Sequence, residues 1–69
     1  MSSLYKKVEV VGTSPVSFSE AVKNAVVEAS KTIRNMAWFE VTEERGRIKD
    51  GAVVEFQVTI KIGFRIDRD

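Results

Sequence analysis

The sequence predicts an α+β fold in which a three-stranded antiparallel sheet wraps around one helix, in the order β-α-β-β. From Val54 to Ile66 every second residue is apolar without a miss, which is typical of a strand with one buried face. Apolar residues also recur at helical spacing over residues 18–33. Lys49-Asp50-Gly51 is a turn signal, so the last two strands should form a hairpin. No linker, repeat or low-complexity tract interrupts residues 1–69, which are therefore predicted to form a single domain.

The first strand is expected over Leu4 to Val11. Val8 and Val10 share one face there, while polar residues alternate with them on the other. Gly12-Thr13-Ser14-Pro15 is expected to break the strand, because glycine and proline interrupt regular structure.

A helix should begin at Ser17, which has the S-x-x-E spacing of a capping box with Glu20. It is expected to end near Asn35, with Lys31 and Arg34 in its last turn, where cations suit the negative end of the helix dipole. One apolar stripe should face the sheet: Phe18, Ala21, Val22, Ala25, Val26, Ala29 and Ile33.

Two more strands are expected after the helix. In Trp38 to Arg45, alternation directs Phe39 and Val41 toward the helix, and Gly46 permits a bulge or bend. The same alternation directs Trp38, Glu40, Thr42 and Glu44 away from it. In the last strand the residues predicted to face the helix are Val54, Phe56, Val58, Ile60, Ile62, Phe64 and Ile66.

The last strand is long for so short a chain. Val54 to Ile66 spans about 40 Å if straight, whereas a lone domain of this length has a radius of gyration of about 11 Å. The strand must therefore curl around the helix, with a bend at Gly63, or extend beyond the subunit to pair with a neighbour. In either arrangement the outer face of the sheet is bare. We expect other copies of the chain to cover it.

Composition excludes several classes of function. The chain has no Cys and no His, which excludes disulfides, thiolate metal sites and Ser-His-Asp catalysis. A net charge of +1 argues against nucleic-acid binding, which usually requires a clear basic excess. No apolar run approaches the length of a membrane helix, and Met1-Ser2-Ser3 does not resemble a signal peptide, so a cytoplasmic protein is expected.

Two residues of the outer sheet face are candidates for ligand binding. Trp38 is the only tryptophan, and pattern alone leaves two interpretations open: packing at a subunit contact, or a stacking platform for a flat ring. Gln57 lies in the middle of the last strand, and its amide offers both a donor and an acceptor to the edge of a heterocycle. If the hairpin pairs in register, Trp38 and Gln57 share one sheet face.

Other polar residues suggest weaker candidates. Arg45-Gly46-Arg47 could present guanidinium groups to a phosphate or could simply be a charged hairpin end. Lys6, Arg34 and Arg65 are possible phosphate or nucleotide contacts. Glu40 and Glu44 should share a strand face, but no acid, base or motif accompanies them, so neither a catalytic residue nor a metal site is predicted.

The chain resembles the dodecins over nearly its whole length, in order and with matching spacing. No single motif is diagnostic, but the combination is specific. The segments of the sequence that are similar to this family are Tyr5-Lys6-Lys7-Val8-Glu9-Val10-Val11-Gly12-Thr13-Ser14, Trp38-Phe39-Glu40-Val41, Arg45-Gly46, Phe56-Gln57-Val58 and Gly63-Phe64-Arg65.

The resemblance implies a flavin-binding protein that assembles as a hollow homododecamer built from trimers. It implies that Trp38 stacks on the isoalloxazine ring, that Gln57 bonds its polar edge, and that Arg45 lies near the flavin, as in bacterial members tuned to FMN. The expected ligand is FMN or riboflavin. Coenzyme A at a separate basic site is also associated with the family, although Glu28 places an acid on the helix surface concerned.

Three functions compete at this point. The first is a non-enzymatic flavoprotein for flavin storage, sequestration and photoprotective quenching. The second is a structural homo-oligomeric assembly protein without a ligand, in which Trp38 only packs a contact. The third is a small flavoenzyme, which ranks last because no residue is placed to act on a second substrate.

Overall fold

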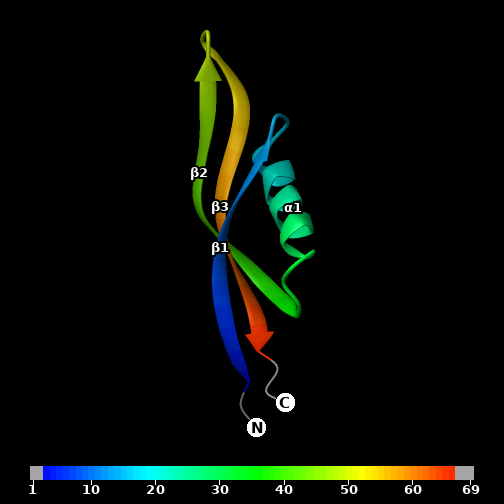
Figure 1. Cartoon of the computed structure of the whole chain (residues 1–69). Helices are drawn as coiled ribbons and strands as arrows, with labels where there is room; N and C mark the ends of the chain where they lie inside the picture. Colours follow the sequence, from blue (N-terminus) through cyan, green and yellow to red (C-terminus); the bar gives the residue numbers. More distant parts are fainter. Residues whose placement is uncertain (1–2, 67–69) are drawn as a thin grey trace.

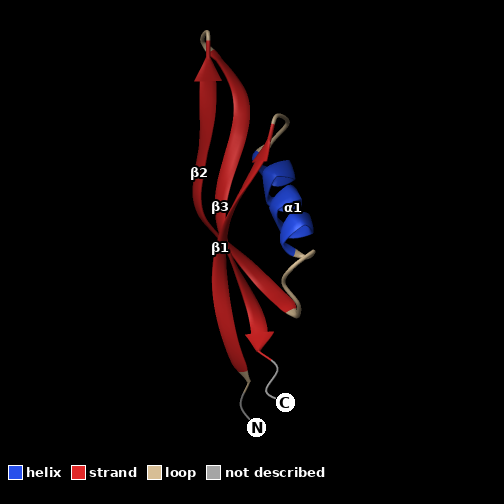
Figure 2. Ribbon diagram, in the orientation of Figure 1, coloured by secondary structure: helices blue, strands red, loops and turns tan. Residues whose placement is uncertain are grey.

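The fold is a β-α-β-β unit in which one helix lies on one face of an open three-stranded sheet (Figures 1 and 2). A computed structural model describes residues 3–66, so both ends of the predicted 1–69 domain lie outside the described residues. The sheet order is β1-β3-β2, and both pairings are antiparallel. The predicted fold class is thereby confirmed. Its elements are β1 (Leu4–Ser14), α1 (Phe18–Ala29), β2 (Met36–Lys49) and β3 (Ala52–Ile66).

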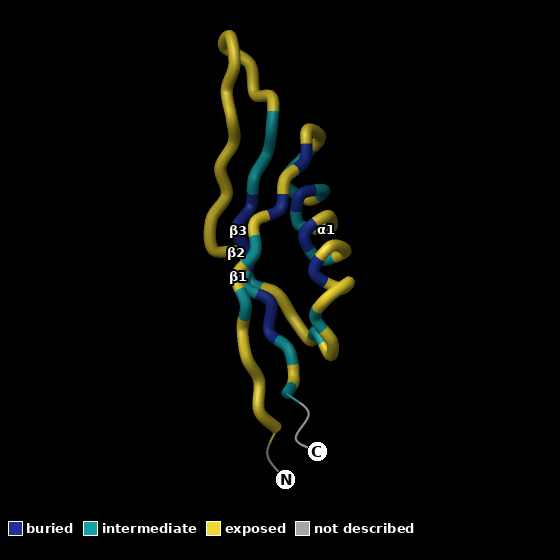
Figure 3. The backbone as a smooth tube through the Cα atoms, in the orientation of Figure 1, coloured by how far each residue is buried: buried dark blue, intermediate teal, exposed yellow. Residues whose placement is uncertain are grey.

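The core lies where the middle of β3 meets the helix (Figure 3). Half of it comes from alternate residues of β3, as their pattern predicted, and half from alanines one helical turn apart on α1. Small side chains on the helix let its backbone approach the sheet closely. Gly12 of β1 allows the same approach, since a Cβ there would overlap the backbone carbonyl of Ala21. The core residues are Val58, Ile60, Ile62, Ala21, Ala25 and Ala29.

β1 is longer than predicted, because Gly12-Thr13-Ser14 continues the strand and pairs with β3. The break comes only after Ser14, whose Oγ accepts a hydrogen bond from the Val16 backbone N–H at 2.9 Å. Ser17 then caps α1, as predicted: its Oγ accepts from the Glu20 backbone N–H at 3.0 Å.

The helix is shorter than predicted. It ends at Ala29, not near Asn35, so Lys31 and Arg34 lie beyond it and its last turn carries no basic residue. After Ala29 the backbone tightens into i→i+3 bonds, with the N–H of Lys31 donating to the carbonyl of Glu28. Asn35 then adopts a left-handed φ of 62°, which no helix can contain. The chain there turns toward β2.

β2 and β3 form a long hairpin around the predicted turn. Lys49 pairs with Ala52, so Asp50 and Gly51 alone connect the strands, and their φ values of 52° and 77° fit a type I′ turn. The register of β2 shifts between Met36 and Trp38, between Val41 and Glu43, and between Arg47 and Ile48.

The shift after Val41 corrects one prediction. Glu40 pairs with Lys61, whereas Glu44 pairs with the buried Val58, so the two carboxylates point to opposite faces. They were expected to share a face, but the extra residue in the bulge at Thr42 reverses the alternation.

The molecule is elongated, with extents of 54 × 20 × 13 Å and a radius of gyration of 14.4 Å. Of the two arrangements left open for β3, the structure shows extension: with β2 it projects well past the helix (Figure 1). Apolar side chains near the end of this hairpin arm are uncovered: Ile48 is 75% exposed and Val53 is 58% exposed. Phe39 and Val41 do point to the helix side, as predicted, but α1 packs on β1 and β3, so Phe39 is still 50% exposed.

Candidate ligand-binding face

The sheet face opposite α1 carries most of the residues that the sequence marked as candidates. Because directly paired residues point to the same side of a sheet, the register assigns this face without ambiguity. We call it the outer face. It comprises Tyr5, Lys7, Glu9, Val11 and Thr13 of β1; Gln57, Thr59, Lys61, Gly63 and Arg65 of β3; and Trp38, Glu40, Glu43 and Arg45 of β2.

Trp38 lies flat on the middle strand. It pairs with Gly63, and a Cβ added to Gly63 would overlap the six-membered ring of the indole. The Tyr5 ring of β1 stands at the edge of this arrangement, with its centroid 5.3 Å from that of Trp38 and the planes tilted by 57°. The Trp38 side chain nevertheless remains 41% exposed, so its outward surface is open to contact.

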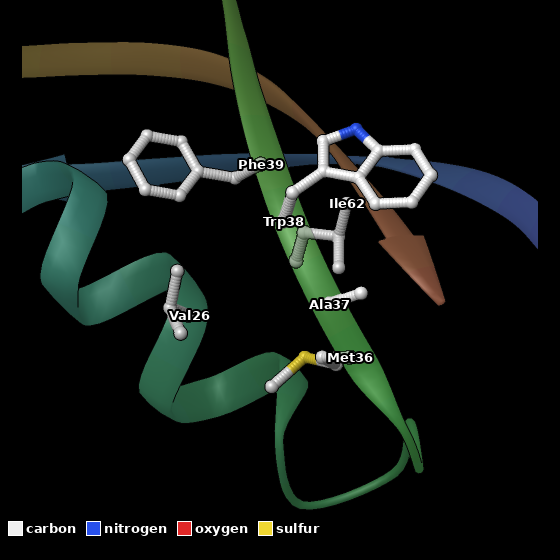
Figure 4. A pocket seen from close by; sticks show the side chains of 6 residues that line it. All are labelled: Val26, Met36, Ala37, Trp38, Phe39 and Ile62. Atoms are coloured by element: carbon white, nitrogen blue, oxygen red, sulfur yellow. The ribbon is translucent and has the colours of Figure 1, made fainter. Parts of the chain in front are cut away.

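Trp38 and Phe39 leave β2 in opposite directions (Figure 4). A mostly apolar hollow of about 200 Å³ lies between α1 and β2, and its lining residues are Val26, Met36, Ala37, Trp38, Phe39 and Ile62. Trp38 therefore contributes both to this hollow and to the outer face.

Glu40 fixes the polar end of the indole. Its Oε2 accepts a hydrogen bond from Trp38 Nε1 at 3.0 Å and forms an ion pair with Lys7 Nζ at 3.1 Å. The bonds from Trp38 and Lys7, with the positive charges of Lys7 and Lys61, hold the pKa of the Glu40 carboxyl below its ordinary value. A carboxylate that accepts charged and polar donors is favoured in its ionised form.

Gln57 belongs to a second cluster on the same face. Its Oε1 accepts from Arg45 Nε at 2.8 Å, and its Nε2 donates to Glu55 Oε1 at 2.8 Å. Arg45 also donates to Thr59 Oγ1 at 3.1 Å and pairs with Glu43 at 3.3 Å. The bulge that separated Glu40 from Glu44 is what brings Arg45 to this face beside Gln57.

Trp38 and Gln57 share one face, as predicted, but they are not neighbours within a chain. Trp38 pairs with Gly63 of β3. Gly63 and Gln57 are six positions apart on that strand, which is about 20 Å of extended chain. Arg45 lies with Gln57 and therefore equally far from Trp38. The chain thus presents two separate half-sites.

Of the other basic candidates, Arg65 pairs with Tyr5 on the outer face, whereas Lys6 and Arg34 lie outside that face. Arg34 and Arg65 line a shallow hollow of about 310 Å³ near the end of β3, where the Arg65 backbone N–H donates to the Asn35 carbonyl. Lys6 is not among its lining residues and pairs with Phe64, on the helix side of the sheet. The structure therefore brings Arg34 and Arg65 together at one hollow, and Lys6 lies apart from them.

Sequence reasoning missed the roles of Glu40 and Gly63 beside Trp38. The signal for Glu40 was present, because residues two apart on a strand point to the same side and an indole N–H needs an acceptor. Gly63 was considered as a bend, whereas it makes room for the indole. Within residues 3–66, no group of three or more carboxylates is placed to hold a metal ion, and no helix is long and apolar enough to cross a membrane.

Comparisons with known proteins agree with one another. Residues 4–67 match the family model of the dodecins. A dodecin from Thermus thermophilus is 46% identical over 67 residues, which cover 97% of each chain. The dodecin structure from Streptomyces coelicolor is 51% identical with a TM-score of 0.92, covering 97% of this chain and 96% of that one. Dodecin from Streptomyces davaonensis is 43% identical with a TM-score of 0.94, covering 99% and 100%. The chain belongs to the dodecin family.

Proposed function

We propose that this dodecin is a cytoplasmic, non-enzymatic carrier that stores a flavin, FMN or riboflavin, and protects it from light. The observation that supports this most strongly is the indole of Trp38, which lies against Gly63, is tied at its N–H and leaves its outward surface open. A rigid, flat, electron-rich surface suits the isoalloxazine ring, and aromatic stacking adds about 0.5–1.5 kcal/mol beyond the burial of area.

Gln57 retains the capacity to bind the edge of such a ring. An amide oxygen has two lone pairs and an amide nitrogen has two N–H groups. Arg45 occupies one lone pair and Glu55 accepts one N–H, so one acceptor site and one donor remain. That pair matches a heterocycle edge with an adjacent donor and acceptor, and Arg45 and Glu55 fix the direction in which it points.

The two half-sites are most simply combined when Trp38 of one chain and Gln57 of another chain form a single binding site. A ring stacked on Trp38 of one chain cannot reach Gln57 of the same chain, about 20 Å away along β3. A second chain that placed its Gln57 beside that Trp38 would complete the site. We propose that these contacts arise in the homododecamer built from trimers that the family resemblance implies, which would also cover the apolar hairpin arm.

Quenching needs only contact. Electron transfer from the Trp38 indole to a photoexcited flavin, followed by its return, consumes no reagent and requires no acid or base. The polar side chains that surround Trp38 are bonded to the indole and to one another, which suits holding a ring in place. Coenzyme A at a basic surface, with Arg34 and Arg65 as its first candidates, is a second ligand to be tested.

A fluorescence titration of the purified particle with FMN tests the proposal. The wild-type protein should bind and quench the flavin, Trp38→Ala should lose most of the affinity and leave any bound flavin fluorescent, and Trp38→Phe should fall between them. Gln57→Ala should weaken binding while bound flavin stays quenched, and Lys23→Ala on α1 serves as the control. Native mass spectrometry of each variant gives the subunit count and any flavin or coenzyme A retained.

Two outcomes would reject the flavin proposal. One is a wild-type particle of intact size that ignores FMN and riboflavin, which would favour an assembly protein without a ligand. The other is unchanged affinity and quenching in an intact Trp38→Ala particle, which would leave Trp38 as an interface residue only.

Arg45 provides a further check. Because its Nε donates to Gln57 Oε1, we expect it to act on the ring through the Gln57 amide. Arg45→Ala should then weaken FMN and riboflavin by similar factors. A loss confined to FMN would instead assign Arg45 to the phosphate.

A further inference from the structure

We propose that Glu40 is the positioning residue of the flavin site: its carboxylate holds the Trp38 indole in the orientation needed for stacking. This inference rests on the proposed function and assigns a role to a residue that does not itself touch the ring. The sequence pattern gave Glu40 no role beyond a strand face that it was expected to share with Glu44. Its contacts in the folded chain give it a more specific task.

The geometry ties the indole down at three places. The Cβ of Trp38 anchors it to β2, and the glycine opposite lets it lie against β3. Its single polar atom, Nε1, donates to Glu40 Oε2 at 3.0 Å. An indole has only this one donor, so the hydrogen bond removes the freedom of the ring to flip about χ2. The surface presented to a ligand is thereby fixed before the ligand arrives, which lowers the entropy lost on binding.

Glu40 is itself held in place. Lys7 Nζ on β1 reaches both carboxylate oxygens, at 3.1 and 3.4 Å. Lys61 of β3 is its register partner, and Glu9 of β1 lies across Lys61 in the same row. The charged groups facing Glu40 are therefore two lysines nearby and one carboxylate beyond them, and the two lysines favour the ionised form of Glu40. A chain of contacts, from Lys7 through Glu40 to Trp38, crosses the sheet from β1 to β2.

The ligand-free protein can test the contact, because the chain has a single tryptophan and hence one indole N–H resonance. In wild type this resonance should lie downfield and exchange slowly with water. It should also titrate with acid, with a midpoint below that of an ordinary glutamate. Glu40→Ala should move the resonance upfield and speed its exchange. Glu40→Gln should keep the bond but abolish the titration, and Glu9→Gln is the matched control in the same row.

The flavin-bound protein tests the consequence. Glu40→Ala should raise the Kd for FMN by about three- to tenfold, and Glu40→Gln should recover most of that loss because its amide oxygen can still accept from the indole. Glu9→Gln should bind like wild type. Each variant is first checked for wild-type particle size, and Glu40→Asp, which shortens the reach but keeps the charge, should weaken binding if Glu40→Ala fails to assemble.

The results separate the two proposals. If wild type binds no flavin, the proposed function fails, while the indole resonance still decides whether Glu40 holds Trp38. If wild type binds flavin but intact Glu40→Ala has an unchanged indole resonance or an unchanged Kd, the positioning role of Glu40 is wrong and flavin binding stands.

Discussion

At the scale of single residues, the outer face depends on one missing side chain. The indole of Trp38 can lie on β3 only because Gly63 has no Cβ, and both residues are aligned by the register of the hairpin. The same indole is tied to Glu40, so a glycine, a carboxylate and an aromatic ring act as one unit. Changes to any of the three should therefore be coupled.

We predict that Gly63→Ala displaces the indole and weakens FMN binding. A forced overlap in a packed site typically costs about 1–3 kcal/mol, which also bounds the expected loss of stability. The measurements are an FMN titration and a denaturant midpoint at fixed protein concentration. In a Trp38→Ala background the added methyl meets no ring, so Gly63→Ala should cost clearly less there; equal costs in the two backgrounds would contradict the contact.

The ionisation of Glu40 predicts a pH dependence with a definite sign. Its pKa is lower in the folded chain than the ordinary value of 4.5, so it stabilises the fold above that value and loses this contribution as pH falls through the folded pKa. Thermal unfolding of wild type and Glu40→Gln should accordingly differ most at neutral pH. The gap should shrink below about pH 4.5, and a gap that widens in acid would contradict the assignment.

At the scale of elements, the sequence predicted those strand and helix positions whose side chains are buried at regular spacing. The alternation of β3 identified its buried side correctly, since Val58, Ile60 and Ile62 belong to the core. Ser17 marked the start of the helix because its hydroxyl can accept the Glu20 backbone N–H. The helix end was misplaced because Ile33 continues the apolar spacing and packs on the core from outside the helix. The bulge at Thr42 leaves no mark in the sequence, so the face on which Arg45 lies could not be predicted.

The N-cap offers a test at this scale. Ser17→Ala removes the acceptor for the Glu20 backbone N–H and should destabilise the folded chain by about 1 kcal/mol. Ser19→Ala, on the exposed side of the same helical turn, is the control and should change stability little. Denaturant unfolding at one protein concentration compares them. Equal midpoints for the two variants would mean that the cap contributes nothing measurable.

At the scale of the whole molecule, the described chain covers little of its own apolar surface. α1 lies over β1 and β3, so the helix-side face of β2 is half exposed, and Ile48 near the end of the hairpin arm is uncovered. A small chain without disulfides has few other means of stabilisation, and association of copies is the one that this shape favours.

We predict that folding and association are inseparable. The unfolding midpoint should rise with protein concentration, and sedimentation at micromolar concentration should show no folded monomer. Phe39→Asp, which puts a charge on the exposed helix side of β2, should lower the midpoint and the particle size together. A stable folded monomer of wild type would refute this expectation.

The strand order has a consequence for how the protein is made. The two outer strands, β1 and β2, bond only to β3, which the ribosome synthesises after both of them. While residues 52–66 are still being added, β1 has no partner anywhere in the nascent chain. Pairings between segments so far apart form slowly. Every new chain must therefore pass through an interval in which the edges of β1 and β2 are unpaired. A good yield of folded protein then requires that β3 is completed promptly and that these edges are protected from aggregation until it is.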